Sequence, residues 1–392
     1  MKVNYILLLV FMLSIFTGCK EKSSEVTITG QLENVEDGTI INLTKSEGNI
    51  AIPISTDTLR EGKFRFTFKD SINEARLFSI MAKGDGFPPT WLDIWVAPGA
   101  KIEISGKDKL IRTWNVESDI TEQKELNQFK SITGEYQKMI QSIMTEAYSY
   151  FDARKKNPEK SKEYVAKMDS LYAIRDSLDI LIIKKEVDLL AQNKTYSKVW
   201  LQKLNDHSMP LRYTELPQEY IDKMKNLYEN MPKDMKKSDT AQSIYLSLYP
   251  PTIVKEGDNM ADTDMWDVDG KMHHLADYKG KYILIDFWSS GCGPCIMAIP
   301  EMKEISEAYK DKLTIISISS DTKDIWQKVS KEKDISWVNL NDFKGEDGIK
   351  IRYGVIGIPH YVMISPEGKV ITSWMGYGKG SLKNKMEELI KS

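Results

Sequence analysis

The sequence predicts three consecutive parts: an antiparallel β-module, a helical segment and a C-terminal α/β domain. Three observations lead to this division. Short segments with alternating apolar residues fill 26–112, apolar residues recur at helical spacing within 118–237, and continuous apolar strands alternate with helices over 251–392. A chain of 392 residues is long enough for two or three domains.

The first residues have the pattern of an export signal. Lys2 provides a positive charge ahead of an apolar run over residues 5–16. This run is too short to span a bilayer but suits the core of a signal peptide. The pattern predicts a signal peptide over residues 1–18.

The end of this leader carries a candidate lipid attachment site. The motif FTGC ends at Cys19, and small residues followed by a cysteine resemble the lipobox of bacterial lipoproteins. The departure is Phe16, because leucine is commoner at that position. The resemblance implies acylation of Cys19; an ordinary signal peptide with an incidental cysteine is the alternative. The polar residues that follow predict a flexible tether over 19–25.

The cysteine content and the net charge limit the classes of function that fit this sequence. The chain has 3 cysteines, so a lipidated Cys19 leaves only Cys292 and Cys295. A pair alone is not the disulfide framework of a small secreted protein, which indicates a redox role for the two thiols. The formal net charge is −3 and no large basic cluster is present, so the sequence favours no nucleic-acid partner.

The β-module is predicted over 26–112. Its segments are short, β-branched or aromatic, and separated by turn residues, and the run Phe64–Phe68 alternates most cleanly. The predicted strands are VTITGQL, TIINLTK, KFRFTFK, ARLFSIMA, LDIWVA and KIEISG.

Residues 118–237 are rich in Glu, Lys, Leu, Met and Tyr, which predicts long amphipathic helices. We interpret the stripe of Tyr, Met and Leu residues between 159 and 193 as packed core rather than a ligand box. His207 is interpreted as a structural or surface residue. A linker is predicted over 238–250, where prolines follow at the end.

The domain over 251–392 is predicted to alternate strands and helices. A hairpin is expected around Asp269-Gly270, because this dipeptide suits a tight turn. Buried strands are expected at KYILIDFW, KLTIISISS, HYVMIS and KVITSW, and helices at CIMAIPEMKEISEAYKD, DIWQKVSKEK and SLKNKMEELIKS.

The motif WSSGCGPC, residues 288–295, follows the first of these apolar strands. Cys292 is expected at the start of a helix, where unpaired backbone N–H groups and the helix dipole favour a thiolate. Cys295 lies three residues later on the same helix face and can attack a mixed disulfide formed at Cys292. Gly293 and Pro294 separate the two.

These residues resemble the thioredoxin fold, specifically the exported thiol–disulfide oxidoreductases of the TlpA/ResA type. Asp286 stands where thioredoxins carry a buried aspartate, and Trp288 matches the aromatic residue that shields the site. Pro300 lies where the active-site helix of the family is kinked. The resemblance implies that Asp286 relays the proton of Cys295, which a pKa raised by burial would favour.

A second motif, IGIPHYVMI at residues 356–364, resembles the family loop with a cis-proline facing the disulfide. The resemblance implies that this proline is Pro359 and that the backbone of Ile358 pairs with an extended substrate. Together with Trp288, Gly293 and Pro294 these residues form the expected substrate-binding surface.

The sequence departs from the family at two positions. Many relatives carry a glutamate three residues after the second cysteine, where this chain has Ala298. Thioredoxin itself has a second tryptophan directly before the first cysteine, where this chain has Gly291. His360 follows the expected cis-proline and is a candidate for tuning the thiolate.

The resemblance implies a lipid-anchored reductase on the periplasmic side of a Gram-negative envelope. No cofactor is expected besides the Cys292–Cys295 disulfide. The implied partners are envelope proteins with disulfides, apocytochrome c among them, and a membrane electron donor linked to thioredoxin. The first 240 or so residues resemble more loosely the module that precedes such domains in Gram-negative lipoproteins.

Three other interpretations remain. A thiol peroxidase would place a lone nucleophile after a Pro-Thr loop, a pattern that is absent here. A lipid-anchored binding or scaffold protein would use the fold without its chemistry, which two intact cysteines disfavour. A zinc site would need two further ligands, and the histidines available are His207, His273, His274 and His360.

Overall fold

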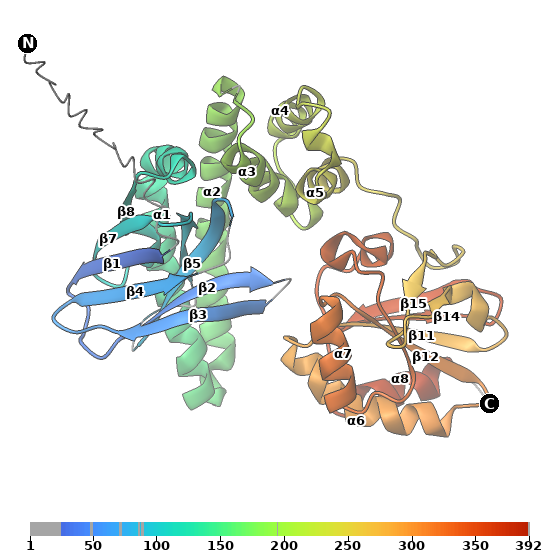
Figure 1. Ribbon diagram of the computed structural model, residues 1–392. Helices are drawn as coiled ribbons and strands as arrows, with labels where there is room; N and C mark the ends of the chain where they lie inside the picture. The colour runs from blue at the N-terminus through green and yellow to red at the C-terminus, as the bar shows by residue number, and fades with distance from the viewer. Residues whose placement is uncertain are drawn as a thin grey trace, which may run out of the picture.

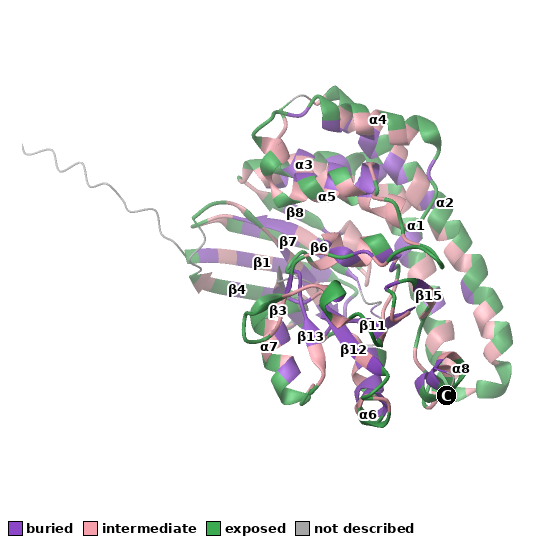
Figure 2. Cartoon of the chain, turned by 90° about the vertical axis from the view of Figure 1, so that its right-hand side faces the viewer, coloured by how far each residue is buried: buried purple, intermediate pink, exposed green. Residues whose placement is uncertain are grey.

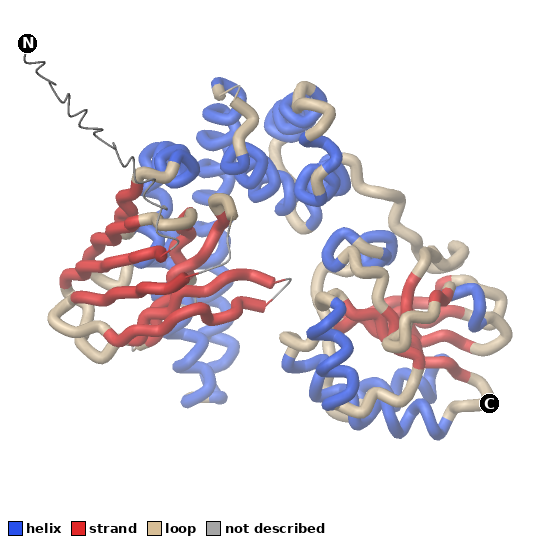
Figure 3. Tube along the Cα trace, in the orientation of Figure 1, coloured by secondary structure: helices blue, strands red, loops and turns tan. Residues whose placement is uncertain are grey.

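The computed structural model describes residues 25–47, 50–69, 73–84, 87, 90–193 and 195–390. The predicted signal peptide, Cys19 and most of the tether lie outside the described residues. Within the described part, none of the helices combines the length and the apolar composition of a membrane span. Figures 1 and 3 show two sheet-containing parts joined by helices.

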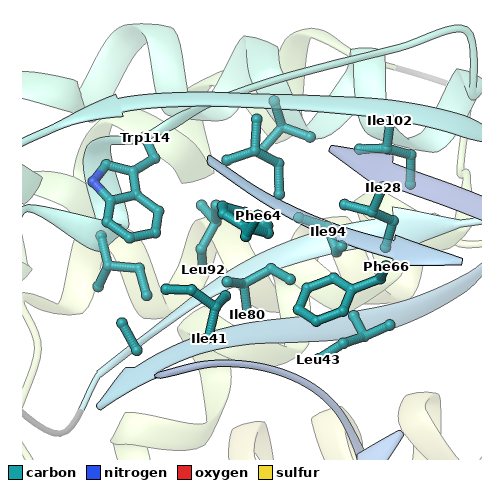
Figure 4. Close-up of a cluster of buried hydrophobic side chains, with 14 of the residues drawn as sticks. Ile28, Ile41, Leu43, Phe64, Phe66, Ile80, Leu92, Ile94, Ile102 and Trp114 are labelled. Carbon is teal, nitrogen blue, oxygen red and sulfur yellow. The ribbon is translucent and has the colours of Figure 1, made fainter. Parts of the chain in front are cut away.

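The N-terminal part is a pair of four-stranded sheets, with strand orders β4-β1-β7-β8 and β3-β2-β5-β6. The strands are β1 (Glu25–Glu33), β2 (Ile40–Glu47), β3 (Ile50–Thr58), β4 (Lys63–Lys69), β5 (Arg76–Lys83), β6 (Trp91–Val96), β7 (Lys101–Lys107) and β8 (Asn115–Ser118). Inward-facing side chains of both sheets form one apolar core, shown in Figure 4. The alternation of Phe64–Phe68 places Phe64 and Phe66 in this core.

The module differs from the prediction in three respects. It continues past residue 112 to β8, and Trp114 is fully buried in the core. Strand β3 was not predicted. Strands β1 and β7 are parallel, whereas the other pairs of the module are antiparallel. A parallel pair joins segments far apart in the chain, so local pattern does not reveal it.

The helical segment is confirmed as a set of packed helices. Its helices are α1 (Thr121–Lys156), α2 (Ser161–Gln192), α3 (Lys198–Ser208), α4 (Gln218–Glu229) and α5 (Asp239–Leu248). Met168, Leu178 and Ile182 of the apolar stripe are buried, as a packing role requires. His207 is also buried and bonds Glu186 at 2.8 Å, which confirms its structural role.

The linker prediction over 238–250 is wrong, because α5 occupies most of that range. The hydroxyl of Ser238 caps the helix by accepting a hydrogen bond from the backbone N–H of Ala241. Ala241, Ile244 and Leu248 then follow at helical spacing and are buried against the other helices. The charged and polar residues around Ser238 favoured a linker, so this short helix was not predicted.

The C-terminal part is a five-stranded sheet with order β13-β12-β11-β14-β15. Its elements are the hairpin β9 (Met265–Trp266) and β10 (Met272–His273), then β11 (Tyr282–Trp288), α6 (Gly293–Ala308), β12 (Leu313–Ser319), α7 (Lys323–Glu332), β13 (Val338–Leu340), β14 (His360–Ile364), β15 (Val370–Met375) and α8 (Ser381–Leu389). Strands β11 to β13 are parallel, and β14 and β15 are antiparallel to their neighbours. The predicted strands and helices of this domain are all present, and β13 is additional.

Helices α6 and α8 pack on one face of this sheet, where Ala298, Met302, Leu382 and Met386 form an apolar core with strand residues. The opposite face is covered by shorter segments, including the 3-10 turn η7 (Ile349–Tyr353). Figure 2 shows that the strands of this sheet are mostly buried. The layers therefore hold β11 rigidly, and β11 leads to the cysteine motif.

Arg212 ties the helical segment to the C-terminal domain. Its Nη2 lies 2.6 Å from Asp347 Oδ1, and its Nη1 donates to the Glu346 carbonyl at 3.2 Å. Its Nε donates to Ser247 Oγ of α5 at 2.8 Å. The Arg212 side chain is only 8% exposed, so these charge-assisted bonds are shielded from water.

Replacing Arg212 with alanine is expected to loosen the C-terminal domain from α5. The loss of shielded, charge-assisted bonds amounts to roughly 1–3 kcal/mol. Limited proteolysis across residues 249–260 should become several times faster, while the chemistry of the disulfide stays unchanged. Lys198→Ala is the control, because its ion pair with Glu74 is exposed and contributes little. Equal proteolysis of the two variants would contradict this role of Arg212.

Candidate active site

The site begins where β11 ends. Residues Ile283 to Trp288 of this strand are all buried, and the chain then turns at Ser289 to Gly291 to enter α6. A strand that is apolar on both faces fits the centre of a covered sheet. The carboxyl end of β11 thereby places Cys292 at the N-terminus of α6.

The two cysteines form a disulfide, with their Cα atoms 5.3 Å apart. Cys292 is the N-cap residue of α6, and Cys295 lies in its first turn. Cys292 is partly exposed, whereas Cys295 is only 3% exposed. Gly293 and Pro294 between them are exposed, and a proline suits this first turn because its missing N–H would have no helical partner there.

The helix start polarises Cys292. The backbone N–H of Cys295 donates to Cys292 Sγ over 3.2 Å. That N–H is one of those left unpaired at a helix N-terminus, and the helix dipole adds positive potential there. In the reduced protein the same arrangement stabilises a thiolate on Cys292, the more accessible sulfur.

Asp286 lies on the face of β11 that α6 covers. Leu284 on this face packs in one cluster with Ala298, and Trp288 packs in another with Cys295, so Asp286 between them faces the first turns of α6. Asp286 is 4% exposed, and its Oδ2 accepts a hydrogen bond of 2.8 Å from Ser317 Oγ. Burial raises the pKa of Asp286 to about 7, against the lowering effect of the Ser317 bond.

Trp288 lies beneath the disulfide. It is 2% exposed and packs with Cys295 and Trp326, while its Nε1 donates to Asn339 Oδ1 at 3.3 Å. This burial corrects the expectation that Trp288 lines the substrate surface. Trp288 lies at the end of a buried strand, so its side chain packs against the buried side of the disulfide and is not exposed to a substrate.

The loop before β14 contains a cis peptide between Ile358 and Pro359, as expected. Ile358 packs in the same cluster as Trp288 and both cysteines, which places this loop beside the disulfide. The Pro359 carbonyl accepts from the backbone N–H of Gly376 at 2.8 Å and is thereby fixed to the end of β15. Ile358 lies ahead of the β14 ladder, which begins at His360.

Exposed apolar side chains flank the site. Ile356 is 64% exposed in the cis-proline loop, and Met375 is 57% exposed at the end of β15. The two segments adjoin, because an added Cβ at Gly357 would come within 2.8 Å of Met375 Sδ. Met297 on α6 is 61% exposed. Exposed apolar residues next to a loop that adjoins a reactive sulfur, here Ile356 and Met375, are typical of a surface that contacts another polypeptide.

Two other predicted positions lie away from the reacting atoms. His360 pairs with Phe287 across the β11–β14 ladder and therefore faces the side of the sheet opposite Asp286. Burial lowers the pKa of His360, which favours the neutral form of the ring. Ala298 is fully buried under the sheet, so its position offers no carboxylate to the site.

Sequence reasoning missed Ser317, Trp337 and Asn339. Ser317 lies opposite Asp286 in the β11–β12 register and accepts a hydrogen bond of 2.8 Å from Trp337 Nε1. Asn339 accepts from the indoles of both Trp288 and Trp326. The one available signal was the serine inside the apolar strand TIISIS, since a buried polar residue needs a partner.

Among the described residues, no three His, Cys, Asp or Glu side chains come together in a way that would hold a metal ion. His273 instead bonds Asp267 and Tyr278, each at 2.8 Å, in the β9–β10 hairpin. The chemistry that the arrangement supports is that of a dithiol at the start of α6, with a buried carboxylate on the strand face that α6 covers.

Known proteins resemble this part of the chain. A family model described as Redoxin matches residues 255–390. The thiol-disulfide oxidoreductase ResA of Bacillus thuringiensis subsp. konkukian is 37% identical over 141 residues, which cover 36% of this chain and 77% of that protein. The thioredoxin-like protein YneN of Bacillus subtilis is 26% identical over 121 residues, covering 30% of this chain and 69% of that protein.

Solved structures are similar over the same region. The thioredoxin domain of a thiol-disulfide oxidoreductase from Bacteroides vulgatus has 30% sequence identity and a TM-score of 0.32, and the match covers 35% of this chain and 99% of that one. The identity with ResA, over more than two thirds of its length, together with the Redoxin match across the dithiol domain, shows that the chain belongs to the ResA-type thiol–disulfide oxidoreductases.

Proposed function

We propose that this chain reduces disulfides of envelope proteins, with Cys292 as the nucleophile, Cys295 as the resolving thiol and Asp286 as the proton acceptor. The main support for assigning Cys292 as the nucleophile and Cys295 as the resolving thiol is the unequal exposure of the two residues. A substrate disulfide can reach the partly exposed Cys292, whereas Cys295 is buried behind it. The Gly-Pro dipeptide between them is that of thioredoxin, whose reduction potential is about −270 mV.

The reaction balances over two steps. The Cys292 thiolate attacks one sulfur of the substrate disulfide, and the other sulfur leaves as a thiolate that takes a proton from water. Cys295 then transfers its proton to Asp286 and attacks Cys292 Sγ, which expels the second substrate sulfur as a thiolate that takes a proton from water. The substrate gains two electrons and the dithiol becomes the Cys292–Cys295 disulfide. A membrane electron donor of the thioredoxin-linked type would reduce that disulfide again.

Asp286 suits the second step for two reasons. It faces the α6 turn that carries Cys295, and its raised pKa of about 7 lies near the operating pH. A base with such a pKa can accept a thiol proton and release it again in the next cycle. A surface aspartate, with a pKa of about 4, would hold the proton too weakly.

The substrate is proposed to be an extended polypeptide segment. Ile358 precedes the β14 ladder beside the disulfide, where its backbone can pair with an added strand. Ile356, Met375 and Met297 offer exposed apolar contacts around it. Methionine side chains adapt to different partners, which suits a reductase that acts on several proteins.

Insulin reduction tests the proposed activity. The parent protein with dithiothreitol should precipitate the insulin B chain faster than dithiothreitol alone, because the Cys292 thiolate reacts more readily than the reagent. A rate no higher than that of dithiothreitol would contradict a reductase and favour the scaffold interpretation.

The localisation is proposed to be the periplasmic side of a Gram-negative envelope, with the acyl chains of Cys19 as the anchor. Its support is the leader of residues 1–18, the FTGC motif and a dithiol that needs an oxidised substrate.

Replacing Cys19 with alanine is expected to release the protein from membranes. Acylation needs the Cys19 sulfur, and the described helices offer no other membrane segment. Fractionation of cells followed by detection of the protein in the soluble and membrane fractions provides the measurement. Cys292→Ala is the matched control and should stay with the membrane. Retention of both variants in washed membranes would contradict lipid anchoring as the only attachment.

A further inference from the structure

A chain of hydrogen bonds runs from the residue directly before β13 to β12 and then to β11, the strand that leads to the dithiol. Trp337, directly before β13, donates its Nε1 proton to Ser317 Oγ of β12 at 2.8 Å. Ser317 Oγ in turn donates to Asp286 Oδ2 of β11 at 2.8 Å. Ser317 and Asp286 are buried and Trp337 is half-buried, so water competes little with these bonds.

The direction of this chain is fixed by the donors themselves. An indole N–H can only donate, so Ser317 must accept from Trp337 with a lone pair. The single hydroxyl proton of Ser317 is then left for Asp286. Both dipoles therefore point toward the carboxylate. Trp337 cannot accept a proton, so the chain is no exit path for the proton that Asp286 receives.

No other described group is seen to offset the burial of Asp286. Tyr361 of β14 faces it across the ladder, and Cys295 faces it from α6. Burial raises the pKa of the Tyr361 hydroxyl above its usual value, so this group stays neutral. Glu301 and Tyr377 lie beyond Tyr361 and bond each other at 3.0 Å. The hydroxyl of Ser317 is the group that lowers the pKa of Asp286 against burial.

We infer that Ser317 and Trp337 are positioning residues for Asp286, which hold Oδ2 of its ionised form and leave Oδ1 to receive the proton of Cys295. This inference rests on the proposed relay role of Asp286. A neutral hydroxyl donor stabilises the carboxylate less than a charged donor would, so Asp286 keeps enough basicity to take a thiol proton. Trp337 orients the hydroxyl, because its N–H occupies a lone pair of Ser317 Oγ and leaves the hydroxyl proton for Asp286.

Two measurements on the full chain test the inference. The first is the titration of the Asp286 carboxyl by carbon-13 NMR with labelled aspartate, assigned with the Asp286→Asn variant. The second is a rapid-mixing experiment with reduced protein and a disulfide that releases a coloured thiolate. The first phase reports attack by Cys292, and the second phase reports resolution by Cys295.

Ser317→Ala is expected to raise the pKa of Asp286 by about one unit, because the carboxylate loses its stabilising donor. Below pH 7 the second phase should then be about tenfold slower, since one unit changes the ionised fraction tenfold. The first phase should change less than about twofold. Trp337→Phe should produce about half of that pKa shift, because the hydroxyl remains but is no longer oriented.

Matched variants separate positioning from packing. Ser317→Thr keeps the hydroxyl and is expected to retain most of the parent pH profile. Ser373→Ala removes an exposed serine from β15 of the same sheet and should change neither phase. If Ser317→Ala does not fold, the titration of Trp337→Phe still decides the question.

An unchanged Asp286 titration in Ser317→Ala, or in Trp337→Phe where the former is unfolded, would overturn the inference. A second phase that is equally fast in Asp286→Asn would instead overturn the proposed relay. The two failures are distinguishable, because the NMR titration does not depend on activity.

Discussion

Replacing Cys292 with serine is expected to abolish insulin reduction, with a loss of at least about 1000-fold, whereas Cys295→Ser should accumulate mixed disulfides with substrate. The exposed sulfur at the helix N-cap forms the first bond with substrate, so its loss stops the reaction at the start. Without Cys295, the mixed disulfide on Cys292 lacks the thiol that resolves it. The fold should remain, because the disulfide closes a loop of only a few residues.

Mass spectrometry after incubation with a disulfide-containing peptide gives the measurement. With two peptides joined by a disulfide as substrate, most of the Cys295→Ser protein should gain the mass of one of the two peptides. A much smaller fraction of the Cys292→Ser protein should carry this adduct. The double variant Cys292→Ser/Cys295→Ser is the control for other reactions. Equal adducts on the two single variants would show that the roles of nucleophile and resolving thiol are assigned wrongly.

The dithiol site was predictable because its parts lie next to one another in the chain. The apolar strand β11, the turn and the cysteines at the start of α6 occupy one short stretch, and each has its own local signal. The cis peptide at Pro359 was predicted from the family loop alone, and the structure has it. The roles of Cys292, Cys295 and Asp286 stay predictions until variants are measured.

Features that depend on contacts between distant segments were not predictable. Ser317 lies 31 residues from Asp286, and Trp337 lies 20 residues beyond Ser317, so no local spacing links them. The inward position of Trp288 follows from Asn339 and Trp326, which approach from other elements. The parallel pairing of β1 with β7 and the burial of α5 likewise arise from tertiary packing. The periodicity and composition of a segment predict its secondary structure, whereas these contacts depend on which strands become neighbours in the folded sheet.

Asp286→Asn is expected to be more stable than the parent at pH 7. Burial raises the pKa of Asp286 from 3.8 in the unfolded chain to about 7 in the folded one. The folded state therefore holds a proton that the unfolded state releases, so stability falls as pH rises from about 4 to about 7 and is level above that. The shift corresponds to at most about 4 kcal/mol at pH 7.

Asparagine carries no charge and so escapes this loss, but its amide N–H groups need acceptors in a buried place, which costs about 1–3 kcal/mol. The net gain at pH 7.5 is expected to be at most about 1–3 kcal/mol, and near pH 4 it should vanish or reverse. Urea unfolding of both proteins at the two pH values, with the disulfide intact, provides the measurement. Lower stability of Asp286→Asn at both pH values would show that the carboxylate has a structural hydrogen-bonding role.

The same variant should be about 10–100 times slower in insulin reduction at pH 7, because Cys295 loses the base that takes its proton. This deficit should shrink at alkaline pH, where hydroxide can take the proton of the Cys295 thiol directly. A merely structural aspartate would produce a deficit that does not depend on pH, so the profile separates the two roles. Higher stability together with a deficit that fades at alkaline pH is the combination that only a buried proton acceptor explains. Full activity of Asp286→Asn at pH 7 would exclude the relay.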